Sequence, residues 1–121
     1  MASENVKKYI QTIDEKYREC KLAKLSRFSA EWGIWSREMN VEIDGKIKAG
    51  HPDGDLLKYV KVYWINVSQL LEAHYKFYTF SKMALKKKIA REGEKIKRLI
   101  LAGRVPNLNE KDIGKMILKN L

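Results

Sequence analysis

The stretch that decides the fold runs from Asp55 to Ala102 and reads DLLKYVKVYWINVSQLLEAHYKFYTFSKMALKKKIAREGEKIKRLILA. It contains no proline, its only glycine is Gly93, and Gly54 and Gly103 flank it. Apolar residues recur along it at alternating steps of three and four residues, which is the spacing of one face of an α-helix. We therefore predict helix over 55–102, as one continuous helix or two collinear ones.

The first half of this stretch carries two adjacent rows of mostly apolar residues. The main row comprises Leu57, Val60, Trp64, Val67, Leu71, His74, Tyr78, Ser81 and Leu85. The second row comprises Leu56, Tyr63, Leu70 and Phe77. Two adjacent rows make a face wider than one partner helix covers. This helix is therefore predicted to touch at least two neighbours, and another subunit could supply some of them.

A single helix over 55–102 would be too long for a compact domain of this size. At 1.5 Å per residue, 48 residues would extend over about 70 Å, which is longer than a compact domain of 121 residues. We therefore expect one of two outcomes. Either the helix breaks near Gly93, or its C-terminal end projects beyond the core.

The N-terminal region, residues 3–49, is also predicted to be helical, with Ser3 as its N-cap. Its buried row comprises Val6, Ile10, Ile13, Tyr17, Cys20, Leu25, Phe28, Trp32, Trp35, Met39, Ile43 and Ile47. The row slips in phase between Cys20 and Leu25, which bends a helix or rotates its buried face. A break near residue 33 or within 40–45 stays open, because residues 41–48 (VEIDGKIK) also fit a β-hairpin. Helix is the favoured alternative, since two three-residue strands are marginal alone.

Two stop signals divide the rest of the chain. Glycines and a proline predict a loop at 50–54 and a second at 103–108, followed by a short helix over 109–120. Short loops imply antiparallel neighbours. The predicted fold is thus a single all-α domain over 1–121, a long antiparallel helical hairpin or small helical bundle with a short C-terminal helix.

Charge is the strongest functional signal in the sequence. The chain has 25 basic and 15 acidic residues, a net charge of +10, and residues 82–121 alone hold 12 basic and 4 acidic ones. Within 82–104 the acidic residues are Glu92 and Glu94. The basic residues there are Lys82, Lys86, Lys87, Lys88, Arg91, Lys95, Lys97, Arg98 and Arg104. Such a helix is predicted to follow a phosphate backbone with little sequence readout.

Several alternatives to this interpretation stay open or are disfavoured. The basic helix could instead dock on an acidic partner protein, as an interaction or assembly module. A helix-turn-helix is disfavoured, because Gly93 alone interrupts a lysine-rich helical pattern. Membrane-surface binding is disfavoured, because the apolar face beyond Leu85 is thin. Tyr59, Tyr75 and Phe80 leave the main row and are candidates for exposed base stacking or for subunit contacts. Trp64 and Tyr78 are expected in the core.

Catalytic and metal-binding patterns are weak. Cys20 is the only cysteine, His74 lies in an apolar row, and both are expected to be core residues. Glu38, Glu42, Asp44, Asp53 and Asp55 lack metal-loop spacing and are expected to be caps or surface charges. We expect no catalytic residue, metal or cofactor. Without a leader-like or membrane-spanning apolar run, the chain is expected to be intracellular.

Together these patterns predict a non-enzymatic nucleic-acid-binding protein that works as a subunit of an oligomer or nucleoprotein assembly. The pattern of cations does not distinguish DNA from RNA, or single from double strands.

Overall fold

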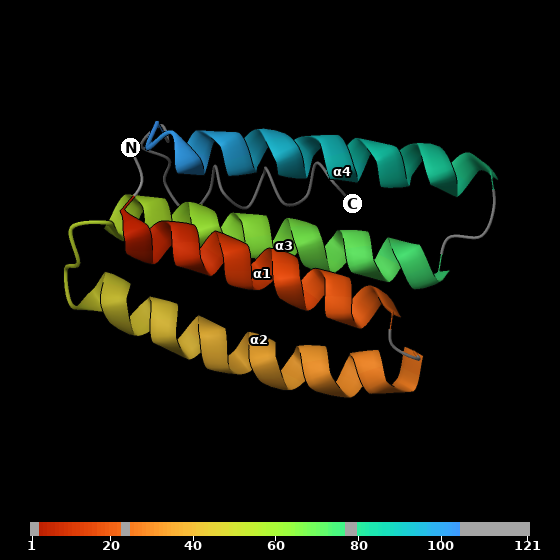
Figure 1. The fold of residues 1–121 in the computed structure, drawn as a ribbon, viewed down its shortest axis with the longest axis horizontal. Helices are drawn as coiled ribbons and strands as arrows, with labels where there is room; N and C mark the ends of the chain where they lie inside the picture. Colours follow the sequence, from red (N-terminus) through yellow and green to blue (C-terminus); the bar gives the residue numbers. More distant parts are fainter. Residues whose placement is uncertain (1–2, 23–24, 77–79, 105–121) are drawn as a thin grey trace.

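The computed structural model describes residues 3–22, 25–76 and 80–104, without the side chains of 22, 25–29, 74–76 and 80–83. These residues form the four helices α1 (Glu4–Leu22), α2 (Leu25–Lys48), α3 (Gly54–Lys76) and α4 (Phe80–Leu101). Consecutive helices run antiparallel (Figure 1). The prediction of an all-α helical bundle is confirmed. Residues 41–48 belong to α2, so the helical alternative is confirmed there and the hairpin is wrong.

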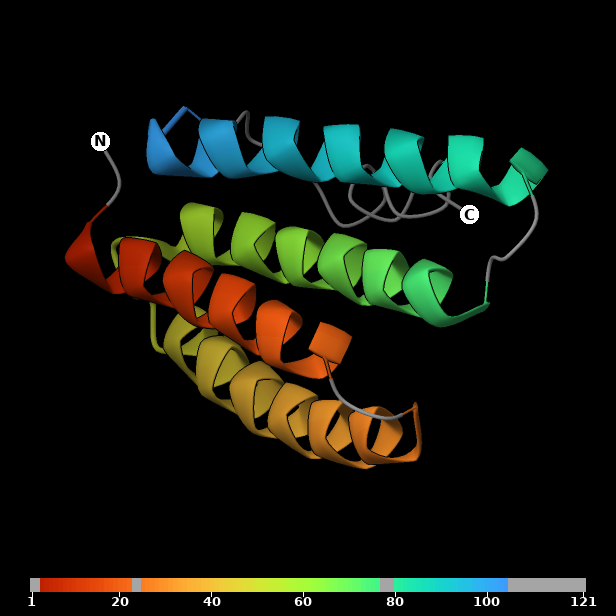
Figure 2. The ribbon, with the colours of Figure 1, turned by 45° about the vertical axis from the view of Figure 1, so that its right-hand side comes forward.

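The prediction of one helix, or two collinear ones, over 55–102 is wrong. The stretch forms α3 and α4, which pack side by side in opposite directions (Figures 1 and 2). Gly93, the expected breakpoint, lies inside α4. Two physical reasons favour the reversal. The sequence from Tyr75 to Phe80 is rich in aromatic residues and contains Thr79, all with modest helix propensity. Folding back also lets α4 cover the wide apolar face of α3 instead of leaving it in water.

The N-terminal helical region is also interrupted at a different place from the one expected, which was near residue 33 or within 40–45. α1 ends at Leu22 and α2 begins at Leu25, so the interruption coincides with the phase slip in the apolar row. Gly33 and Gly45 both lie within α2, and a side-chain methyl at either would meet nothing within 4 Å. A helix packed on its neighbours tolerates such glycines at a cost of about 1 kcal/mol each.

The two glycine-containing loop sequences form the same type of C-terminal cap, one at the end of α2 and the other at the end of α4. At the end of α2, Gly50 N–H donates to Ile47 C=O and His51 N–H to Lys46 C=O, both at 3.1 Å. α4 ends with the equivalent pair of hydrogen bonds, in which Gly103 takes the place of Gly50. Both glycines have positive φ, 74° and 67°. This is the Schellman motif, which favours glycine at that position. The predicted helix at 109–120 lies outside the described residues.

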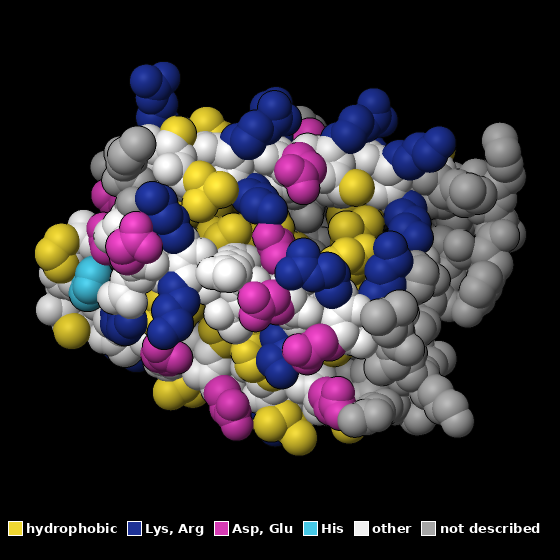
Figure 3. Space-filling view, in the orientation of Figure 1, with side chains coloured by type: hydrophobic (Ala, Val, Ile, Leu, Met, Phe, Trp, Pro, Cys, Tyr) yellow, Lys and Arg dark blue, Asp and Glu magenta, His cyan; other side chains and the backbone are white. Residues whose placement is uncertain are grey.

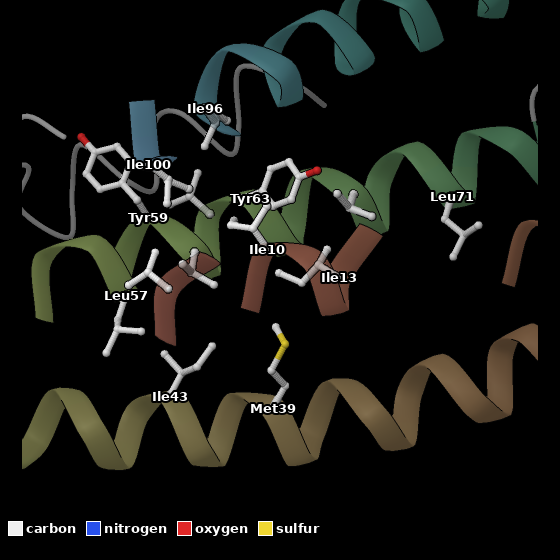
Figure 4. Packing of buried hydrophobic residues seen from close by; sticks show 14 of the residues in the cluster. Ile10, Ile13, Met39, Ile43, Leu57, Tyr59, Tyr63, Leu71, Ile96 and Ile100 are labelled. Carbon is white, nitrogen blue, oxygen red and sulfur yellow. The ribbon is translucent and has the colours of Figure 1, made fainter. Parts of the chain in front are cut away.

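The core is centred on α3, which contacts all three other described helices. Figure 4 shows Leu57 and Tyr63 of α3 among side chains of the other helices, including Ile10, Ile13, Met39, Ile43, Ile96 and Ile100. Leu71 of α3 belongs to the same core cluster. The wide apolar face of α3 is therefore covered within the chain. No second subunit is needed to explain its width.

Candidate nucleic-acid interface

Helix α4 buries one side and carries its cations on the other. Ile89, Ile96 and Ile100 of α4 are buried, and α4 contacts α3 and α1. Five basic residues are exposed on the opposite side of the helix, and we call them the α4 cation face: Lys87, Lys88, Arg91, Lys95 and Arg98. Figure 3 shows Lys and Arg side chains along the edge of the molecule that α4 forms. Lys87 and Arg98 are eleven residues apart, so the face is about 16 Å long.

The cations of this face are largely free of carboxylates. Within the part of the chain that the structure describes, Lys87, Lys88, Arg91 and Lys95 have no carboxylate oxygen within 4.0 Å. Glu94 is the one exposed acidic residue among them, since Glu92 is half-buried. The face thus presents a strong positive field to solvent, which attracts polyanions.

A close contact between Gly93 and Asn66 fixes α4 on α3. Asn66 is buried, and its Nδ2 donates a 3.1 Å hydrogen bond to the carbonyl of Ile89 in α4. A Cβ added to Gly93 would stand 3.2 Å from Asn66 Cγ and closer still to Oδ1. Glycine is therefore required for this approach of the two helices. The contact holds the backbone that carries Arg91 and Lys95.

Lys97 is placed differently from the rest of the basic segment. Its Nζ donates to Asp14 Oδ2 of α1 at 2.6 Å, and Asp14 Oδ1 accepts the hydroxyl of Tyr63 at 2.5 Å. Burial, then the hydrogen bond and negative charge of Asp14, raise the pKa of Tyr63. This three-residue group joins α1, α3 and α4. Lys97 is consequently part of the packing between helices.

The remaining predicted site residues fall into three situations. Lys86 is half-buried on the flank of α4. Arg104 is exposed but lies beyond the end of α4, after the Gly103 cap. Lys82 belongs to the first turn of α4, and its side chain lies outside the described residues. The structure therefore brings five of the nine predicted residues together on one exposed face.

The aromatic residues support packing more than stacking. Tyr59, a candidate for exposed stacking or subunit contacts, is only 2% exposed and belongs to the core, so that candidate assignment is wrong. Trp64 packs against the core, as predicted. The side chains of Tyr75, Tyr78 and Phe80 lie outside the described residues.

Several residues considered for reactivity or metal binding are buried or make structural contacts. Cys20 is buried, and burial raises the pKa of its thiol, which favours the protonated form. Asp44 pairs with Lys61 at 2.6 Å, and Asp53 accepts the Ser3 hydroxyl at 2.6 Å. Among the described residues, no three His, Cys, Asp or Glu side chains gather as a metal site. The side chain of His74 is not among those described.

The chain has no significant match to a protein-family model, a curated protein or a solved structure. None of the described helices is long and apolar enough to cross a membrane. The proposals below therefore rest on the geometry and charge of this chain.

Proposed function

We propose that the protein is a non-enzymatic nucleic-acid-binding protein that grips the phosphate backbone with the α4 cation face. One observation carries the proposal: five exposed cations share one side of a helix whose other side is buried. Cations held in this way release condensed counterions when they neutralise phosphates, which is the main source of sequence-independent affinity.

The chemistry of the face favours backbone contacts over base readout. Its described side chains are Lys and Arg, which bind phosphate oxygens regardless of sequence. The described aromatic residues are buried or half-buried, so they offer no stacking surface beside these cations. The proposed interaction is consequently nonspecific in sequence, and its affinity falls as salt concentration rises.

Binding of fluorescent 24-base-pair DNA and RNA duplexes and matching single strands, titrated across salt concentrations, tests the proposal. Because each phosphate contact contributes a slope of about 0.9 in log K against log salt, reversing Lys87, Arg91 and Arg98 to Glu should lower the slope by about two to three. The matched control reverses the exposed Lys8, Arg37 and Lys48 of α1 and α2 to Glu. It changes net charge equally and should lower the slope much less.

Two results would overturn the proposal. One is the absence of wild-type binding at low salt, and the other is an equal loss of binding in the α4 variant and the control. Weak, unselective nucleic-acid binding, together with a stable complex with an acidic protein that the α4 variant loses, would favour the docking alternative instead.

Assembly on nucleic acid is the second part of the proposal. The width of the α3 face no longer motivates it, because α1, α2 and α4 cover that face. On the described surface, the large exposed aliphatic side chains are Ile34 and Val41 of α2. They lie seven residues apart on one side of that helix. Molecular mass measured by sedimentation with and without duplex, for wild type and for Ile34→Ser/Val41→Ser, tests this part.

A further inference from the structure

A second group of cations lines an open groove between α1 and α4. The groove has a volume of about 440 Å³, and Ile10 of α1 and Leu101 of α4 form its apolar part. Its polar lining consists of Lys7, Gln11, Asp14, Arg18 and Lys97. Three of these five side chains are cationic and one is a carboxylate. In Figure 3, Lys and Arg side chains also gather along the boundary between α4 and the helices below it.

The α1 side of this groove is a regular flank of the helix. Lys7, Gln11, Asp14 and Arg18 recur at steps of four, three and four residues, so they share one side of α1. The ion pair between Asp14 and Lys97 places that side toward α4. Lys7 and Arg18 are eleven residues apart, which is about 16 Å along the axis. The α4 cation face has the same length.

The carboxylate that lines the groove, Asp14, is already paired, whereas two of the cations are not tightly paired. Asp14 binds Lys97 and the Tyr63 hydroxyl, as described above. Lys7 lies 3.6 Å from Glu4, whose side chain is 94% exposed, so this ion pair is weak. Within the described part of the chain, Arg18 has no carboxylate oxygen within 4.0 Å. Lys7 and Arg18 are therefore available to an anion.

We propose that Lys7 and Arg18 form a second row of phosphate contacts, so that nucleic acid held on the α4 cation face also contacts α1. This inference rests on the proposed function and extends its surface to a second helix. The Asp14–Lys97 ion pair is its structural basis, because it fixes the cationic flank of α1 against the cation-bearing helix.

The test compares two double variants on the same 24-base-pair DNA duplex. Lys7→Glu/Arg18→Glu reverses the groove cations. Lys8→Glu/Lys48→Glu is the matched control, because Lys8 is on the other flank of α1, lining the groove toward α2. We expect the groove variant to lower the slope of log K against log salt by about two and the affinity at least tenfold. The control should change affinity less than threefold, and thermal unfolding should show both variants folded.

The outcomes separate this inference from the proposed function. If the groove variant matches the control while reversal of Lys87, Arg91 and Arg98 still weakens binding, Lys7 and Arg18 make no phosphate contacts and the inference is overturned alone. If wild type does not bind the duplex, the proposed function is overturned and the inference with it.

Discussion

Trp32 of α2 donates its indole N–H to the hydroxyl of Ser68 in α3, at 3.1 Å. The relationship is reciprocal, because Trp64 of α3 donates its indole N–H to Ser36 of α2 at 3.2 Å. In each helix the tryptophan precedes the serine by four residues, so the two side chains lie on one face. These two reciprocal hydrogen bonds set the register of α2 against α3. They also satisfy the polar ends of two large, packed aromatic side chains.

We expect Ser68→Ala to lower the free energy of unfolding by about 1–3 kcal/mol, because it leaves the largely buried indole N–H of Trp32 without its acceptor. Urea denaturation measures the change. Thr12→Ala is the control, since the Thr12 hydroxyl donates to the Lys8 carbonyl within the same helix. It should cost less than about 0.5 kcal/mol. An equal loss of unfolding free energy in the two variants would show that the Trp32–Ser68 hydrogen bond does not stabilise the packing of α2 on α3.

Gly93→Ala should destabilise the protein by about 1–3 kcal/mol, because the new methyl group meets the buried Asn66 side chain. Gly45→Ala should stabilise it by about 0.5–1 kcal/mol, because that position is an open one in a helix. Thermal unfolding of both variants checks the opposite signs. Because Asn66→Ala also removes the hydrogen bond to the Ile89 carbonyl, the cost of Gly93→Ala is measured again in an Asn66→Ala background, where it should be much smaller. An equal cost in both backgrounds would show that the clash is not the cause.

Lys97→Met should lower the free energy of unfolding by about 1–2 kcal/mol, because it leaves the half-buried Asp14 carboxylate without its cation. Lys95→Met, two residues away on the exposed side, should change stability by less than about 0.5 kcal/mol. Denaturation at low salt measures both. Similar values for the two variants would mean that Lys97 contributes no more to stability than a surface lysine does.

Stability should fall at alkaline pH, and Tyr63 should account for part of the fall. The pKa of Tyr63 is raised in the folded protein, so the folded state favours its neutral form. This contribution is fully present below the ordinary tyrosine pKa of about 10 and is lost as pH rises above it. Tyr63→Phe cannot ionise, so its deficit relative to wild type should shrink between pH 9 and pH 11. A constant deficit over that range, measured by urea denaturation, would exclude this linkage.

Much of the local structure could be predicted from spacing alone. Val6, Ile10 and Ile13 are buried in the row that the sequence predicts, and Ser3 caps α1, as the Val6 N–H bond to its hydroxyl shows. Such features depend on residues within a few positions of one another, which helical periodicity reports directly. The cation face was predictable for the same reason, since Lys87, Arg91, Lys95 and Arg98 recur at helical steps.

The errors concern contacts between residues far apart in the chain. Tyr59 leaves the main row of its own helix, which made it a candidate for exposed stacking or subunit contacts, but it lies in the core. Lys97 was grouped with the other cations of the basic segment, since nothing local distinguishes it from Lys95. The sequence did not single out Lys7 and Arg18, because the basic and acidic residues of α1 are nearly equal in number. Their position became a candidate surface only when the structure placed that side of α1 next to α4.

The sequence by itself therefore determined that the chain is helical, where Gly50 and Gly103 end its helices, and which helix carries the excess positive charge. These properties follow from local hydrogen bonding, backbone freedom and periodicity. Only the tertiary structure decided that residues 55–102 fold back on themselves, that Asn66 requires glycine at position 93, and that Asp14 neutralises Lys97. Those outcomes depend on burying a wide apolar face and on pairing charges 83 residues apart, and no local pattern encodes either.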